Sequence, residues 1–225
     1  GHLLGGFLFG VGMTLSGGCG QRTLVRAGGG NLKSLVVMLL MGITAYMTLR
    51  GLLALVRLNV IEVANIDLAA RNIADQSMAT LIQAATGAAD AKTVRWIVAG
   101  ITGLGFTIYA LASAEFLKSF KNLFAGVSIG LFVVAGWYIT GKLGFDEFEP
   151  VRLESYTFVA PVAENVNYLM TFTGSTINFG IAAVFGIIAG SFLYAVLSGN
   201  FQIETFSSRA DMVNHMIGGV LMGFG

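Results

Sequence analysis

Residues 3–23 read LLGGFLFGVGMTLSGGCGQRT and join an apolar run to a glycine-rich interruption. The apolar part, Leu3 to Ser16, would form about 21 Å of helix at about 1.5 Å per residue. That length falls short of the roughly 30 Å hydrocarbon core of a bilayer. The stretch therefore predicts a half-length membrane helix that ends at Gly17 and Gly18, with a second short helix beginning near Cys19 or Gly20.

The composition of the whole chain places it in a membrane. Of the 225 residues, 55% are hydrophobic and 11% are charged, and the mean hydropathy is +0.78. A soluble domain usually has about 25% charged residues, so too few charges remain here to cover a water-facing surface. The apolar stretches are continuous and lack the alternation of a membrane barrel. They predict an all-α polytopic membrane protein.

We expect a single membrane-embedded domain, residues 1–225, that contains further spans. Its parts are a first motif and span (1–56), an extramembrane connection (57–95), two spans (96–140), a loop with a segment that could be re-entrant (141–177), and a span followed by a second motif (178–225). The expected helices are Asn31 to Val56, a surface helix around Ala69 to Ala85, Trp96 to Ala114, Asn122 to Thr140, Asn178 to Ser198, and a further apolar run from Met212. We interpret Ser155 to Ile177 as an interfacial or re-entrant segment, whose irregular backbone would be tolerated at membrane depth only where protein buries it or it lines a cavity. The positive-inside rule places Arg22, Arg26 and Lys33 on the cytoplasmic face.

The two ends of the chain resemble each other. Residues 2–12 read HLLGGFLFGVG and residues 215–225 read HMIGGVLMGFG, so the His and four Gly positions coincide without a gap. Glycine-rich membrane helices can match by chance, but the chain has only two histidines and both are aligned. We interpret the match as an internal duplication and expect the polypeptide to continue beyond both ends, with a second glycine-rich motif after Gly225. Such repeats are typical of transporters, and the sequence leaves parallel and inverted halves open.

Several functional classes lack support in the sequence. The formal net charge of +1 does not give the basic footprint of a nucleic-acid-binding protein. No phosphate-binding loop, zinc-protease motif or paired-cysteine motif is found, so we expect no metal, no cofactor and no catalytic residues. The histidines, His2 and His215, are interpreted as capping or packing groups. The GxxxG pairs are interpreted as helix-packing sites.

Glu164, Asn165 and Asn167 are either cavity-lining or solvated.

The glycine-rich break has the features of an anion-binding site. A helix that begins at membrane depth presents unpaired N–H groups and a partial positive charge. The predicted substrate-binding residues are Cys19, Gly17, Gly18, Gly20, Gln21 and Arg22. The Cys19 thiol is a weak, polarisable donor that suits a soft sulfur atom. Two alternatives stay open: the cysteine could be an inert small side chain, and Arg22 could extend to the membrane interface instead of drawing in an anion.

Three stretches resemble the YeeE/YedE sulfur-transport family. They are GVGMTLSGGCGQRTLVRAGGGNLKSL (10–35), TFVAPVAENVNYLMTFTGSTINFG (157–180) and NHMIGGVLMGFG (214–225). The resemblance implies a permease of the bacterial cell inner membrane. It also implies two related halves whose broken half-helices meet at a central constriction, with Cys19 as the central cysteine of the first half. The second-half motif and an N-terminal cysteine-bearing helix would lie beyond the two ends.

These observations predict uptake of thiosulfate or a related inorganic sulfur anion, without enzymatic activity. Besides the lipid bilayer, a soluble cytoplasmic sulfur-carrier protein could be a partner. Two alternatives belong to other classes. One is a membrane-embedded sulfurtransferase that carries persulfide on Cys19. The other is a membrane scaffold for a soluble sulfur-relay protein.

Overall fold

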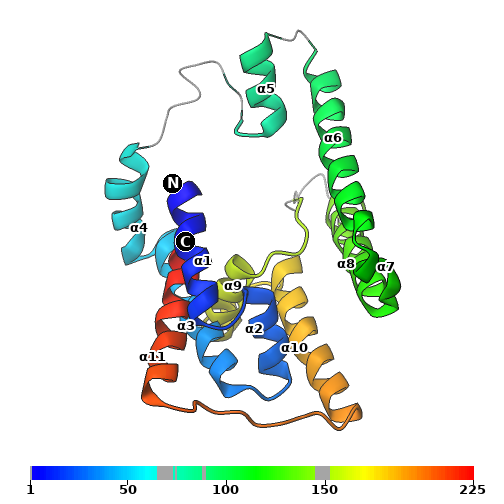
Figure 1. Cartoon of the computed structure of the whole chain (residues 1–225). Coiled ribbons are helices and arrows are strands. Elements are labelled where there is room, and N and C mark those ends of the chain that lie inside the picture. The colour runs from blue at the N-terminus through cyan, green and yellow to red at the C-terminus, as the bar shows by residue number, and fades with distance from the viewer. Residues whose placement is uncertain (1, 65–72, 74, 88–89, 145–152) are drawn as a thin grey trace. The chain divides into compact units, whose positions relative to one another are not determined.

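The computed structural model describes residues 2–64, 73, 75–87, 90–144 and 153–225, and its regular elements there are helical (Figure 1). Five helical stretches are long and apolar enough to cross a membrane: His2–Gly28, Leu32–Arg50, Lys92–Ala112, Phe120–Leu143 and Phe179–Leu197. The first of these stretches contains a break. The prediction of an all-α polytopic membrane protein is confirmed.

Backbone contacts divide the chain into two compact units, residues 65–132 and residues 1–64 together with 133–225. In the smaller unit, α5 packs against α6, which Asp90 caps by accepting a hydrogen bond from the Lys92 N–H. The surface helix expected around residues 69–85 is observed only in its second half, as α5; residues 73 and 75–77 are not helical, and residues 65–72 and 74 lie outside the described part. The helices of this unit are α5 (Met78–Thr86), α6 (Ala91–Ala112), α7 (Ala114–Lys118) and the first part of α8 (Phe120–Tyr138).

The larger unit is built around α3, which packs against α2, α9 and α11, while α10 packs against α2 and α9 (Figure 1). Its hydrophobic core cluster comes from five of these helices: Leu24, Val37, Met41, Val162, Val184 and Met222. The helices are α1 (His2–Leu15), α2 (Gly20–Gly28), α3 (Leu32–Arg50), α4 (Leu52–Val56), α9 (Val159–Met170), α10 (Phe179–Leu197) and α11 (Arg209–Phe224). Shorter helical turns are Arg57–Ile61, Glu62–Ala64, Ile139–Leu143 and Phe172–Gly174. The span expected over residues 31–56 is divided because Gly51 adopts an extended conformation between α3 and α4.

The first and last helices, α1 and α11, lie side by side and run antiparallel (Figure 1). An ideal Cβ on Gly12 would lie 2.8 Å from the Gly218 carbonyl oxygen, and one on Gly5 would lie 2.6 Å from the Gly225 carbonyl oxygen. The backbones therefore approach too closely for any side chain at these positions. In the predicted repeat, Gly5 corresponds to Gly218 and Gly12 to Gly225. The contacts are therefore exchanged: Gly12 meets the repeat counterpart of Gly5, and Gly5 meets the repeat counterpart of Gly12.

The centre of residues 155–177 forms a regular helix, α9, where irregular backbone was expected, and the placement of this segment as interfacial or re-entrant stays a prediction. Pro161 lies in the first helical turn, where a missing N–H costs nothing. Val162 is buried against α3, where a Cβ on Gly42 would lie 3.0 Å from both Val162 and Val166. Tertiary packing of these side chains stabilises the helix. The polar residues between them hide its apolar face in the sequence.

Residues 200–204, between α10 and α11, run along the turn that joins α2 to α3. The Gln202 N–H donates to the Gly29 carbonyl (3.4 Å) and the Glu204 N–H to the Gly30 carbonyl (3.3 Å). The Leu32 N–H donates back to the Glu204 carbonyl at 2.9 Å. We call residues 200–204 the connecting segment. It fixes the α2–α3 turn to the start of α11.

Candidate functional site at the helix break

The chain breaks between α1 and α2 as the glycine pattern predicts. Gly17 has a φ of 72°, the left-handed conformation that favours glycine. The Gly18 N–H donates to the Met13 carbonyl at 3.0 Å, which is the longer-range hydrogen bond of a Schellman motif at the end of α1. Cys19 is the N-cap residue of α2, with an extended backbone (φ −74°, ψ 170°). The cysteine therefore lies where one half-helix ends and the next begins.

Ser16 fastens this break to α11. Its side chain is buried, and its hydroxyl donates to the Gly12 carbonyl at 2.7 Å. The same hydroxyl lies 3.7 Å from the Met222 Sδ atom. Both contacts reach the close packing surface between α1 and α11, so the position of the break depends on that surface.

The N-terminus of α2 has no side-chain cap. Ser, Thr, Asp and Asn are the usual N-cap residues because their oxygen accepts an N–H bond from the first turn. Cys19 makes no such bond, and its half-buried side chain is a free thiol. Its carbonyl accepts from the Thr23 N–H (2.9 Å) and the Thr23 hydroxyl (3.0 Å). The first-turn N–H groups are thus left for another acceptor, which an anion can provide.

The six predicted binding residues differ in exposure. Gly17, Gln21 and Arg22 are exposed, Gly18 and Cys19 are half-buried, and Gly20 is buried. The Arg22 side chain folds over Gly18, where a Cβ would lie 2.7 Å from the Arg22 Cδ atom. Gly20 faces Phe158 and Met41 in the core. Their roles in substrate binding stay predictions.

Two nitrogen-bearing side chains near the break were not among the predicted site residues. A Cβ on Gly17 would lie 3.5 Å from Arg26 Nη1 and 4.0 Å from His215 Nε2. Arg26 follows Arg22 by one helical turn, a spacing that places both on one face of α2 and could have indicated it. His215 is aligned in the repeat, but its distance from residue 17 in sequence gives no signal of this contact.

The ring of His215 is oriented by Asp211 and Phe206. Its Nδ1 atom lies 2.8 Å from the Asp211 carbonyl oxygen and 3.1 Å from the Asp211 carboxylate. Phe206 meets the ring edge-on, with centroids 5.8 Å apart. These contacts direct the other ring nitrogen, Nε2, towards the break.

A network of ion pairs involves Arg26 and Asp211, the residues that lie next to Gly17 and His215. Lys33 Nζ is 3.3 Å from Glu204 and 3.1 Å from Asp211, and Arg26 Nη2 is 3.8 Å from Glu204. The Asn31 side-chain amide also donates to Glu204. The hydrogen bond from Lys33 holds the pKa of Glu204 below its ordinary value of 4.5, although partial desolvation opposes this shift. The carboxylate is therefore charged at neutral pH, and its contribution is lost only as the pH falls through that lowered pKa.

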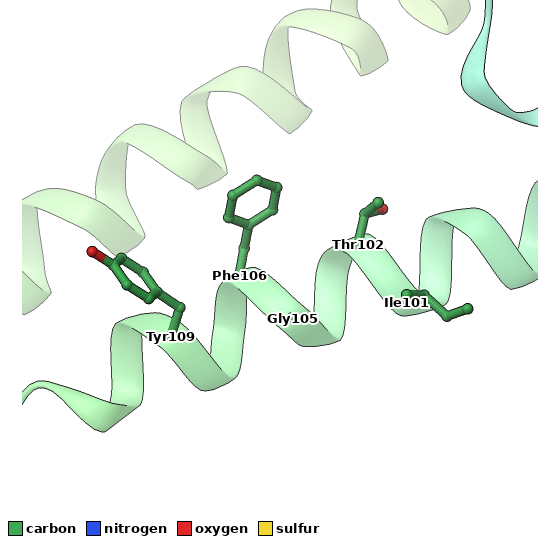
Figure 2. Close-up of a pocket in the computed structure, with 5 residues that line it drawn as sticks. All are labelled: Ile101, Thr102, Gly105, Phe106 and Tyr109. Atoms are coloured by element: carbon green, nitrogen blue, oxygen red, sulfur yellow. The ribbon is translucent and has the colours of Figure 1, made fainter.

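A groove on α6 does not have the chemistry of an anion site. Figure 2 shows its lining residues along one stretch of α6: Ile101, Thr102, Gly105, Phe106 and Tyr109. The groove measures about 440 Å³. It has no charged lining, and the Thr102 hydroxyl is already bonded to the Val98 carbonyl at 2.7 Å. An exposed apolar helix face of this kind suits lipid.

A more polar cavity, of about 550 Å³, lies between the C-terminal part of α3 and α9. The sequence left open whether three polar residues of α9, Glu164, Asn165 and Asn167, line a cavity or are solvated. Glu164 and Asn167 line it, and Asn178 donates to Glu164 at 2.6 Å. Asn165 is instead buried and donates to the Pro161 carbonyl at 2.8 Å. In the part of the chain that the structure describes, no three His, Cys, Asp or Glu side chains gather to hold a metal.

Comparison with known proteins assigns the chain to a family. The sequence profile of the family described as Sulphur transport matches residues 1–225. The chain is 26% identical over 236 residues to the thiosulfate transporter TsuA of Escherichia coli (strain K12), covering 100% of this chain and 62% of that protein. It is also 26% identical over 229 residues to the thiosulfate transporter TsuA of Spirochaeta thermophila, covering 100% of this chain and 65% of that protein. The chain therefore spans less than two thirds of these relatives, and it belongs to the sulphur transport family.

Proposed function

We propose that the chain is part of a permease that takes up thiosulfate, or a related inorganic sulfur anion, across a bacterial inner membrane. The observation that carries this proposal is the break at Cys19, where this member of the sulphur transport family has an uncapped helix N-terminus beside a free thiol. The relatives named thiosulfate transporter support the choice of substrate. Transport needs no covalent step at this site, so we assign no enzymatic activity to the chain.

In the proposed mechanism, the break receives the two ends of the anion separately. The oxygens accept hydrogen bonds from the backbone around Gly17, Gly18, Gly20 and Gln21, where the α2 dipole favours negative charge. The neutral Cys19 thiol donates a weak hydrogen bond to the terminal sulfur, because a thiolate would repel the anion. The exposed Arg22 attracts the anion electrostatically.

The packing of α1 on α11 supports inverted over parallel halves. Helices related by parallel repeats share one direction across the bilayer, whereas inverted repeats run in opposite directions. The two helices run antiparallel and meet through exchanged pairs, Gly5 with Gly225 and Gly12 with Gly218. We therefore propose that the second half approaches the first across this contact. A soluble sulfur-carrier partner stays a prediction.

Uptake of labelled thiosulfate by the full-length protein in liposomes tests this function. We expect uptake by the wild type, none with Cys19→Ala, and strongly reduced uptake with Cys19→Ser, which retains a hydroxyl in place of the soft sulfur. Size-exclusion profiles of all three proteins control for folding. Full uptake by Cys19→Ala would exclude a role for the thiol.

The same preparation separates the two alternatives from other classes. A persulfide adduct on Cys19, seen by mass spectrometry after exposure to thiosulfate, would point to a sulfurtransferase. A wild type that folds but takes up no thiosulfate without a soluble protein would point to a scaffold.

A further inference from the structure

A second polar cavity lies at the C-terminal end of α2, the end away from the break, between the α2–α3 turn and the connecting segment. It measures about 350 Å³, ample for a small oxyanion. Its lining consists mainly of polar groups from two parts of the chain: Arg26, Gly29, Asn31, Asn200, Gln202, Ile203 and Glu204. None of these residues is among the predicted site, and the mechanism above does not use the cavity.

Arg26 connects this cavity with the break. One terminal nitrogen, Nη1, lies near Gly17, and the other, Nη2, lies 3.8 Å from Glu204 in the cavity wall. Its side chain is only 30% exposed, although it belongs to a helical stretch apolar enough to cross a membrane. Arg26 lies in the last turn of α2, from which its guanidinium reaches both Gly17 and the wall of the cavity.

The cavity offers donors for an anion and one acceptor that competes with it. Arg26 can bind two oxygens at once through its planar guanidinium, and the amides of Asn200 and Gln202 can donate as well. Glu204 opposes an anion, but Lys33 and Arg26 compensate its charge and the Asn31 amide donates a hydrogen bond to it.

The charges of the network balance closely. Arg26 and Lys33 oppose Glu204 and Asp211, so the cluster is neutral when His215 is neutral. An anion would then bind weakly and leave readily, because Glu204 can take back the Arg26 guanidinium. Weak binding of this kind suits a station that an ion must enter and leave.

We infer that this cavity is a second anion station, where a small divalent sulfur oxyanion is held through its oxygens by Arg26 after it leaves the Cys19 break. Glu204 competes for the same guanidinium and speeds release. The inference rests on the proposed function and adds a second site to it.

Two substitutions separate anion binding from the ion pair itself. Arg26→Gln and Glu204→Gln both break the Arg26–Glu204 pair, but only the first removes the cation that binds the anion. Initial rates of thiosulfate uptake are measured over a range of concentrations, with the full-length protein in liposomes. Arg209→Gln is the matched control, because Arg209 is an exposed arginine at the start of α11 outside both sites.

Opposite effects on the two variants are expected. Arg26→Gln should lower kcat/KM by roughly tenfold or more, as expected for the loss of a charge-assisted hydrogen bond. Glu204→Gln should lower both KM and the maximal rate, since the anion is held longer. Arg209→Gln should behave as the wild type, and Arg26→Lys should recover part of the lost rate.

Two results would overturn the inference while leaving the proposed function intact. In one, Arg26→Gln transports like Arg209→Gln. In the other, Arg26→Gln and Glu204→Gln lose rate equally with unchanged KM, which would make the pair purely structural. If Arg26→Gln fails to fold, the KM of Glu204→Gln decides the test. A wild type without uptake would overturn the proposed function and this inference together.

Discussion

Gly17 is the residue on which the geometry of the break depends most. Its left-handed φ of 72° ends α1 and places Cys19 at the N-cap of α2. It also lies closest to the facing nitrogens of Arg26 and His215. A single backbone conformation thus brings the thiol, the helix N-terminus and two basic side chains together.

We expect Gly17→Ala to destabilise the protein by about 1–2 kcal/mol, because an alanine in the left-handed region meets its own backbone. Gly29→Ala is the matched control, since Gly29 ends α2 with a right-handed φ of −73° and has room for a methyl group. Thermal unfolding in detergent would measure the difference. Equal midpoints for the two variants would show that residue 17 does not need the left-handed conformation.

At the residue scale, features formed by residues close together in the sequence could be predicted, whereas contacts between residues far apart in the sequence could not. The glycines, the cysteine and the half-length helix lie within one continuous stretch, so the break could be predicted. Arg26 and His215 reach it from the end of α2 and from α11. A contact between residues 17 and 215 leaves no pattern in a single sequence, so it could not be predicted.

The pairing of α1 with α11 positions the break. Gly12 and Gly218 permit backbone contact, and Ser16 extends that contact to Met222. Small residues at a helix interface are the usual means by which membrane helices pack closely, because lipid gives no hydrophobic drive for their association. The interface is therefore both a packing surface and the support of the site.

Gly12→Ala tests this interface. The added methyl group would lie 2.8 Å from both the Gly218 carbonyl oxygen and Met222, so we expect a loss of about 1–3 kcal/mol of stability. Gly10→Ala makes the same change on the same helix where nothing lies within 4 Å, and should be neutral or slightly stabilising. Unfolding midpoints of the two variants in detergent give the comparison. If Gly10→Ala proved the more damaging, the assignment of the packing face would be wrong.

Most helices were predictable because their apolar runs are continuous and end at glycines or capping residues. The expected span at residues 178–198, for instance, is observed as α10, which Asn178 caps. The helix α9 was not predictable, because Pro161 and its asparagines resemble a loop until α3 covers its apolar face. The connecting segment was not predictable either, since its hydrogen bonds join residues far apart in sequence.

At the scale of the whole molecule, the chain corresponds to part of the length of its relatives. The chain matches its family over all its residues but covers 62% and 65% of the two relatives. The exchanged glycine contacts between α1 and α11 are those expected if a two-fold axis relates the two proposed halves, and a structure of the full-length protein would test this.

The central claim is that the break at Cys19 receives the sulfur anion. A structure of the full-length protein with thiosulfate, with the anomalous signal of its sulfur atoms recorded, would locate the anion directly. The account predicts a signal at hydrogen-bonding distance from Cys19 Sγ, with oxygens facing the N–H groups that begin α2. Bound thiosulfate elsewhere, with the break in contact with lipid alone, would contradict it.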